Sequence, residues 1–228
     1  VIMKIEMLEG IEAVIFDFDG TLADSMWMWK NIDIEYLKRF GIAPHDTLQD
    51  EISGMSFSET AVYFKEHFHI PDSIQEMKDT WNGLAMNKYR YEITPKSGAI
   101  DFLAYLKSHN IKMGVATSNS RELAEVGIES IGAKEYMDTV RVSCEVKAGK
   151  PAPDIYLLVA QDLGVLPEHC LVFEDIVNGL MAGKSAGMKT CGVEDEFSAR
   201  EVHDKKAIAD YYIQSYEDIL NNTYEVLK

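Results

Sequence analysis

The chain has 228 residues, 46% of them hydrophobic and 26% charged, which is enough for one substantial core and a smaller second lobe. Its 38 acidic and 22 basic residues give a formal net charge of −16. This charge excludes the basic surface typical of nucleic-acid-binding proteins, and anionic membranes would repel it. An anionic substrate would therefore need local positive charge at its binding site.

Three cysteines, Cys144, Cys170 and Cys191, lie far apart in the sequence and have apolar neighbours. This pattern predicts buried thiols rather than a disulfide framework or a metal site. No apolar run approaches the ~20 residues of a membrane span, and the acidic first ten residues do not resemble a secretory signal. We therefore expect a cytoplasmic protein.

Residues 13–25, A-V-I-F-D-F-D-G-T-L-A-D-S, join an apolar run to two carboxylates. Val14 to Phe16 are β-branched or aromatic, as expected of a strand buried on both faces of a parallel sheet. Asp17 and Asp19 would share one face, where repulsion and desolvation raise carboxyl pKa values unless a cation compensates. Gly20 allows a sharp turn after them. The stretch thus predicts an active site with a cation nearby.

A solvated acidic turn, or a calcium loop of the D-x-D-G kind, is the alternative for this stretch. Such a loop needs a glutamate at its twelfth position, and the twelfth residue counted from Asp17 is Met28. The calcium loop therefore does not fit.

Residues 26–92 have helical periodicity and predict an all-helical insert. The methionine and tryptophan residues of this region are spaced as in the core of a small bundle, which favours packing over ligand binding. The expected helices run from an Asp24 or Ser25 cap to Gly41, from Asp46 to Gly54, and onward from two capping boxes, Ser56 with Glu59 and Ser73 with Glu76.

From residue 93 onward, strands alternate with helices, which predicts a doubly wound parallel sheet. Strands are expected at Lys112–Ala116, Thr139–Ser143, Leu171–Phe173, Lys189–Val193 and Tyr211–Ile213. Helices are expected at Ser97–His109, Arg121–Ile131, Pro153–Leu163, Val177–Ala186 and Ser215–Leu220. In such a sheet, ligands bind beyond the carboxyl ends of the strands, at a switch point.

Polar residues follow two of these strands. Thr117, Ser118 and Asn119 precede a helix, whose N-terminal amides suit a phosphate, although a simple helix cap explains them equally well. Lys150 is held between a glycine and a proline and could supply the positive charge that a phosphate needs. Alone, it would more often be an ordinary surface lysine.

A second acidic pair, Glu174 and Asp175, follows the strand at 171–173. Mg²⁺ prefers a few carboxylate oxygens together with water and substrate phosphate. Two acidic strand ends therefore favour a shared divalent cation.

In order and spacing, these segments resemble the motifs of the haloacid dehalogenase-type phosphohydrolase superfamily, in its β-phosphoglucomutase-like and phosphatase subgroup. The matching segments are D-F-D-G-T-L-A-D-S, V-A-T-S, G-K-P-A-P-D around Lys150, and F-E-D-I-V-N-G-L-M-A-G-K-S-A-G-M. The resemblance covers nearly the whole chain. It implies a Rossmann-like α/β core formed by residues 1–25 and 93–228, and a helical cap domain, residues 26–92, inserted after the first strand.

The resemblance also implies roles for the motif residues. Asp17 would be the nucleophile that forms an aspartyl-phosphate, and Asp19 the general acid and base. Mg²⁺ would be held by Asp17, the backbone carbonyl of Asp19 and Asp175, with Glu174 as a candidate helper. The candidate phosphate-binding residues are Thr117, Ser118, Asn119 and Lys150. Two positions depart from the family pattern, Ile176 in place of a common serine and Gly183 in place of a usual alanine.

The expected function is a Mg²⁺-dependent phosphatase acting on a sugar or nucleoside monophosphate, as a monomer or weak homodimer, with no nucleic-acid or membrane partner. A hexose-phosphate mutase is the first alternative. Trp29 and Phe57 stand where the resemblance to β-phosphoglucomutase would place a histidine and an arginine, so a second phosphate should be held poorly. A non-catalytic phosphometabolite-binding protein is the second alternative.

Overall fold

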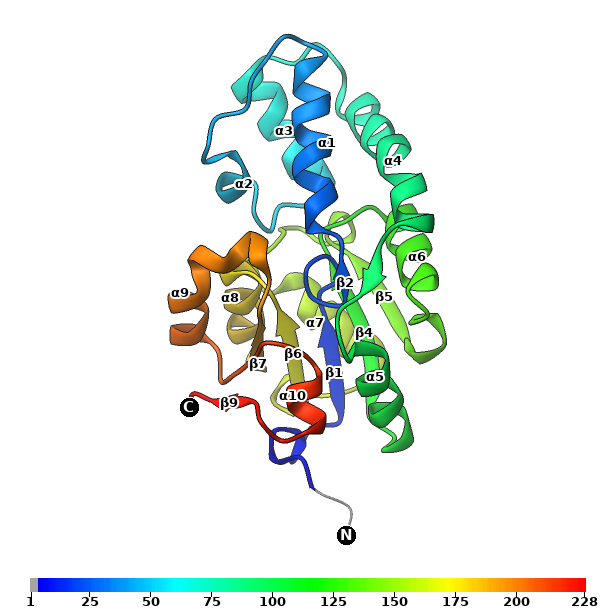
Figure 1. Cartoon of the computed structure of the whole chain (residues 1–228), viewed down its shortest axis with the longest axis vertical. Helices are drawn as coiled ribbons and strands as arrows, with labels where there is room; N and C mark the ends of the chain where they lie inside the picture. The colour runs from blue at the N-terminus through cyan, green and yellow to red at the C-terminus, as the bar shows by residue number, and fades with distance from the viewer. Residues whose placement is uncertain (1–3) are drawn as a thin grey trace.

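A seven-stranded sheet forms the centre of the computed structural model, which describes residues 4–228 (Figure 1). Its strands, in the order β5-β4-β1-β6-β7-β8-β9, are β5 (Thr139–Val142), β4 (Lys112–Thr117), β1 (Ala13–Phe16), β6 (Cys170–Glu174), β7 (Lys189–Val193), β8 (Tyr211–Ile213) and β9 (Glu225–Val226). All neighbours are parallel except β8 and β9. The predicted parallel α/β fold is confirmed; the first three residues of its predicted segment 1–25 lie outside the described part.

Helices cover both faces of the sheet. They are α5 (Ala99–Ser108), α6 (Arg121–Ser130), α7 (Asp154–Leu163), α8 (Val177–Ser185), α9 (Val202–Ile208) and α10 (Glu217–Leu220). The two-residue period of β1 divides the core, because Val14 and Phe16 pack with residues of α5 and α6 while Ala13 and Ile15 pack with residues of α7. All four residues are buried, so β1 lies in the middle of a doubly wound sheet.

The expected strands and long helices form within one or two residues of their predicted ends. The strand expected at Thr139–Ser143 stops at Val142, because a 3₁₀ turn begins at Ser143. Helix α9 and the short strand β9 were not predicted. The 3₁₀ helices are Glu6–Leu8, Lys134–Tyr136, Ser143–Glu145, Pro167–His169 and Glu196–Glu201.

Four helices between β1 and the rest of the core form the cap, which lies beyond the carboxyl ends of the strands (Figure 1). They are α1 (Met26–Lys38), α2 (Leu48–Glu51), α3 (Phe57–Phe68) and α4 (Ile74–Tyr91). Both predicted capping boxes are present, at Ser56 and Ser73. The helix expected from Asp46 to Gly54 was wrong: only Leu48–Glu51 is helical, and Leu48 is its only buried residue. One apolar contact cannot hold a longer amphipathic helix.

Two chain connections join the cap to the core and lie side by side. They form a two-stranded antiparallel sheet, β2 (Ala23–Asp24) with β3 (Thr94–Pro95). Strands of two residues carry no periodic signal, so the sequence did not predict them.

The cysteine prediction is confirmed in part. All three thiols are free, and Cys170 and Cys191 are buried. The prediction of a buried Cys144 was wrong: it is exposed, because it lies in the 3₁₀ turn after β5, where its Sγ is 3.3 Å from Ser58 Oγ. Among residues 4–228, no helix has the length and apolarity to cross a membrane.

The cap packs on the core where α4 meets α6, and a glycine in α6 sets how closely they approach. A Cβ added to Gly127 would lie 2.7 Å from the ring of Phe18 and 2.8 Å from the ring of Tyr89. Both rings are fully buried, so neither can move away without disturbing the interface.

This contact predicts opposite effects for two glycine substitutions in helices. Gly83→Ala, in α4, meets no atom within 4 Å and should stabilise the protein by about 0.5–1 kcal/mol through helix propensity. Gly127→Ala should instead destabilise it by about 1–3 kcal/mol through overpacking. Urea unfolding of the two variants measures the difference, and equal stabilisation by both would contradict the close packing.

Candidate active site

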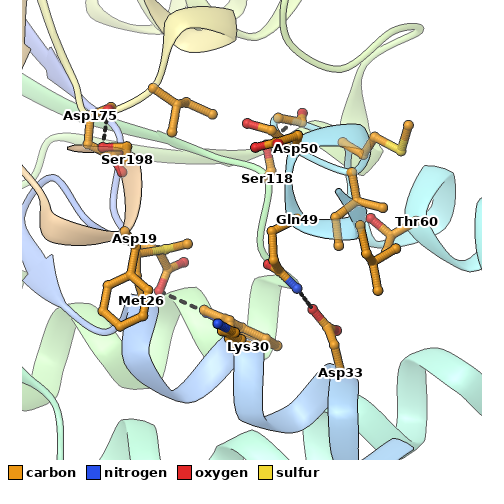
Figure 2. Close-up of a pocket in the computed structure, with 18 of the residues that line it drawn as sticks. Asp19, Met26, Lys30, Asp33, Gln49, Asp50, Thr60, Ser118, Asp175 and Ser198 are labelled. Carbon is orange, nitrogen blue, oxygen red and sulfur yellow. Dashed lines mark hydrogen bonds between the residues drawn. The ribbon is translucent and has the colours of Figure 1, made fainter. Parts of the chain in front are cut away.

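A cavity of about 710 Å³ lies between the cap and the carboxyl ends of β1, β4 and β6. Six of the residues predicted for the site line it: Asp17, Asp19, Thr117, Ser118, Asn119, Lys150. Asp175 also lines it (Figure 2), and Glu174 lies directly behind as a fully buried side chain. The parallel sheet therefore brings together segments that are more than 100 residues apart in the sequence.

Lys150 is the cation at the base of this cavity. Its Nζ donates to Asp17 Oδ1 at 2.7 Å and to the carbonyl of Ala116 at 3.1 Å, and it also contacts Glu174 Oε1. The residue is only 4% exposed. Burial alone would lower the pKa of Lys150, but the carboxylates of Asp17 and Glu174 raise it above its usual value. Lys150 therefore remains an ammonium ion.

Three buried carboxylates, Asp17, Glu174 and Asp175, surround this region, with one oxygen of each within 4.8 Å of the others. The Thr21 hydroxyl lies 3.3 Å from Asp17 Oδ2 and 3.0 Å from Asp175 Oδ1. Burial and the neighbouring carboxylates raise the pKa values of Glu174 and Asp175. A single ammonium cannot balance three carboxylates.

The donor set fits a hard divalent cation, which prefers carboxylate oxygens. Glu174 Oε2 is buried and has no hydrogen-bond partner within residues 4–228. Gly20, at φ +80°, leaves room for Asp175, since a Cβ there would lie 2.3 Å from Asp175 Oδ2. Gly179 leaves room for Glu174 in the same way, with a Cβ 2.0 Å from its carboxyl carbon. Two glycines thus let the carboxylates gather closely.

Asp19 points toward the cap and accepts hydrogen bonds from both lobes. Ser25 Oγ donates to its Oδ1 at 2.6 Å, and the Trp29 indole N–H donates to the same oxygen at 3.2 Å. The Tyr89 hydroxyl also contacts Oδ1, and Asn119 Nδ2 donates to Oδ2 at 2.9 Å. Burial raises the pKa of Asp19, although the hydrogen bonds from Ser25, Tyr89 and Trp29 act against the shift. Asp19 therefore links the catalytic end of the core to helices α1 and α4.

The last residue of β4, Thr117, and the residues that follow it have different surroundings. Thr117 is buried, and its hydroxyl accepts the backbone N–H of Asn119 at 3.1 Å. Ser118 Oγ donates to the carbonyl of Gly54 in the cap at 3.0 Å. The cap of helix α6 is Ser120, whose Oγ accepts a backbone N–H in the first turn. Helix capping is thus assigned to Ser120, and Thr117 to Asn119 face the cavity.

Residues 14–193 match the family described as haloacid dehalogenase-like hydrolase, which is most of the chain. The chain belongs to this family. The resemblance found in the sequence motifs is therefore confirmed, and the protein is a haloacid dehalogenase-like hydrolase.

Individual relatives are similar over nearly the full chain. The phosphorylated carbohydrates phosphatase of Thermotoga maritima is 31% identical over 95% of this chain and 100% of its own. A crystal structure of CbbY from Rhodobacter sphaeroides in complex with phosphate is 26% identical, covers 92% of this chain and 96% of its own, and has a TM-score of 0.82. A crystal structure of a protein named a putative beta-phosphoglucomutase, from T. maritima, is 31% identical, covers 93% of this chain and 98% of its own, and has a TM-score of 0.67.

The two departures from the family pattern have local explanations. Ile176 precedes α8 and offers no capping side chain, but Glu201 Oε2 accepts the backbone N–H of Val177 at 2.9 Å instead. Gly183 allows α8 to approach the sheet closely, since a Cβ there would lie 2.9 Å from Thr190 Cγ2.

The sequence did not identify Tyr89, Trp29 or Tyr156 as members of this hydrolase site. Trp29 was expected in the cap interior, and its ring does pack on Phe57, but its N–H also reaches Asp19 and Tyr89. The Tyr156 hydroxyl contacts Glu174 Oε1. No motif marks such aromatic residues, because their contacts span 10 to 70 residues and arise only from packing.

One further carboxylate, Asp33 in α1, is buried in the cap wall of the cavity. Its Oδ2 accepts a hydrogen bond from Gln49 Nε2 at 2.7 Å (Figure 2). Burial raises the pKa of Asp33 to about 7, and the bond from Gln49 only partly opposes this. The folded protein therefore holds a proton on Asp33 more tightly than the unfolded chain does.

Because the pKa of Asp33 is higher in the folded protein than in the unfolded chain, ionising this buried group destabilises the folded state. The loss of stability develops as the pH rises from about 4 through about 7. We expect Asp33→Asn to raise the melting temperature by several degrees at pH 8 and by less at pH 5. Glu35→Gln, an exposed acid-to-amide change in the same helix, should change it at neither pH. Thermal unfolding at both values tests this, and a lower melting temperature of Asp33→Asn at pH 8 would contradict it.

Proposed function

We propose that this chain is a Mg²⁺-dependent phosphatase that hydrolyses a small phosphorylated carbohydrate through an aspartyl-phosphate on Asp17. The observation that carries the proposal is the buried contact of Asp17 with Lys150, beside two further carboxylates at the closed end of a cavity. An anion that enters this cavity meets a fixed ammonium next to a carboxylate nucleophile.

In the first half-reaction, a carboxylate oxygen of Asp17 attacks phosphorus and the bond from phosphorus to the leaving oxygen breaks. Lys150 binds an equatorial oxygen of the transferring group, and Thr117 and the amides that follow it bind another. Asp19, protonated for this step, gives its proton to the leaving oxygen.

In the second half-reaction, Asp19 takes a proton from water as the water oxygen attacks phosphorus. The bond from phosphorus to Asp17 breaks, which restores the carboxylate and releases inorganic phosphate. The donors around Asp19, from Ser25, Trp29 and Asn119, stabilise its ionised form for this step.

Asp17, Asp175 and the backbone carbonyl of Asp19 would hold Mg²⁺, with Glu174 beside them. When bound, the ion supplies positive charge that offsets repulsion between the carboxylate nucleophile and the phosphate. Glu174 also holds Lys150 in place, so the same side chain serves both cations.

The cap would cover the leaving group and exclude bulk water. Residues 26–92 would move as this lid on the paired connections β2 and β3. Because every site residue comes from one chain, a monomer or weak homodimer suffices. The free thiols fit the expected cytoplasmic location.

A carbohydrate substrate is supported by the T. maritima relative, whose name states activity on phosphorylated carbohydrates. A mutase would need a second phosphate clamp in the cap. Trp29 and Phe57 occupy the places expected for it and pack edge to face, with ring centroids 5.6 Å apart. Lys30 lines the cavity but is a single cation on a wall that also carries Asp33. We therefore favour hydrolysis.

Asp17→Asn should abolish turnover, by at least about 1,000-fold, because the amide removes the nucleophile while keeping its size. The assay measures inorganic phosphate released from 4-nitrophenyl phosphate and from β-glucose 1-phosphate, with Mg²⁺ or chelator present, and follows glucose 6-phosphate in parallel. Turnover of Asp17→Asn near wild type would contradict the covalent mechanism. Efficient formation of glucose 6-phosphate without free phosphate would favour the mutase.

A further inference from the structure

The cap wall of the cavity carries a polar pair, Asp33 and Gln49, opposite the catalytic carboxylates. Figure 2 shows the two side chains meeting on one side of the cavity, with Asp19 and Asp175 on the other. Asp33 comes from α1 and Gln49 from α2, so the pair joins two elements of the cap. None of the proposed catalytic steps uses either residue.

Asp33 is 7% exposed and has no cation partner within residues 4–228. Its Oδ2 is bonded to Gln49, and no donor in the same part of the chain bonds to its Oδ1. Buried carboxylates are normally paired or fully hydrogen-bonded, because desolvation is costly. Because Asp33 lines the cavity, a group on a bound molecule can donate to Oδ1 in place of water.

The charge of the surrounding wall indicates what that molecule carries. Away from the catalytic end, the cavity is lined by five carboxylates, one lysine, one arginine and one histidine. The arginine, Arg200, is paired with Asp50. This balance disfavours a second phosphate or a carboxylate on the substrate. Lys30 and the N–H group of Gln49 in turn disfavour an ammonium group.

Aromatic rings complete this wall. Trp29, Phe57 and Trp81 line the cavity and pack edge to face, with centroids 5.6 and 5.8 Å apart. Such rings cover the C–H face of a carbohydrate, while an acceptor beside a donor matches a hydroxyl group, which can donate and accept at once.

We propose that Asp33 and Gln49 form a specificity subsite that binds a hydroxyl group of an uncharged, polyhydroxylated leaving group. Asp33 accepts the hydroxyl hydrogen, and Gln49 donates to the hydroxyl oxygen or orients Asp33. This inference rests on the proposed phosphatase activity and adds the class of substrate: monophosphates of neutral polyols or sugars.

The test compares kcat/KM for hexitol and hexose monophosphates with kcat/KM for 4-nitrophenyl phosphate, which has no hydroxyl group on its leaving group. The measured ratio is kcat/KM for the best neutral substrate divided by kcat/KM for 4-nitrophenyl phosphate. In Asp33→Asn and Gln49→Leu this ratio should fall roughly 10- to 100-fold, because each variant loses a hydrogen bond of the kind made to a charged group. Glu35→Gln is the matched control and should keep the wild-type ratio.

A series of deoxy analogues of the best substrate locates the contact. For the analogue that lacks the bound hydroxyl, the kcat/KM of the wild type should fall by the same factor of roughly 10- to 100-fold. The kcat/KM of Asp33→Asn should fall little further, because this variant has already lost the contact. If Asp33 had a purely structural role, Asp33→Asn would lower the stability of the protein and leave every kcat/KM ratio unchanged.

An unchanged ratio in both variants would overturn the subsite while leaving the phosphatase intact. So would a wild-type preference for fructose 1,6-bisphosphate or glucosamine 6-phosphate over the neutral compounds. If the wild type hydrolyses none of these esters, including 4-nitrophenyl phosphate, the phosphatase proposal itself fails, and the subsite with it.

Discussion

The buried ammonium of Lys150, held between Asp17 and Glu174, is the contact on which the rest of the site depends. Three buried carboxylates and one ammonium leave negative charge that a bound cation would offset, or else a proton on one of the carboxylates. The protein keeps these groups together because the central strands end at one edge of the sheet. Gly20 and Gly179 then remove the Cβ atoms that would keep the carboxylates apart.

The cap depends on the same centre. Asp19 receives hydrogen bonds from Ser25, Trp29 and Asn119, so the position of the lid and the state of the proposed acid are coupled. Gly127 sets the depth at which α4 rests on α6, and through Tyr89 the distance from the cap to Asp19. The proposed subsite and the proposed catalytic residues thus lie on opposite walls of one cavity.

The sequence predicted the parts of this protein that rest on local patterns. The apolar run before Asp17, the two serine capping boxes and the alternation of strands and helices each reflect a short-range rule. The order of four motifs located the carboxylates and Lys150. The sequence could not predict the short helix α2, the pairing of β2 with β3, or the roles of Tyr89 and Asp33, because these features arise from contacts between distant segments. Cys144 shows the same limit, since apolar neighbours in sequence do not bury a residue in a surface turn.

A divalent cation held by the cluster of Asp17, Glu174 and Asp175 is central to the proposed chemistry. Calorimetric titration of the protein with Mg²⁺, in the absence of substrate, tests this claim most directly. We expect one ion per wild-type chain and binding at least about tenfold weaker in Asp175→Ala, with the exposed-site variant Glu168→Gln unchanged. Circular dichroism would establish that each variant is folded. Absence of Mg²⁺ binding by the wild type, or equal binding by Asp175→Ala, would contradict the account.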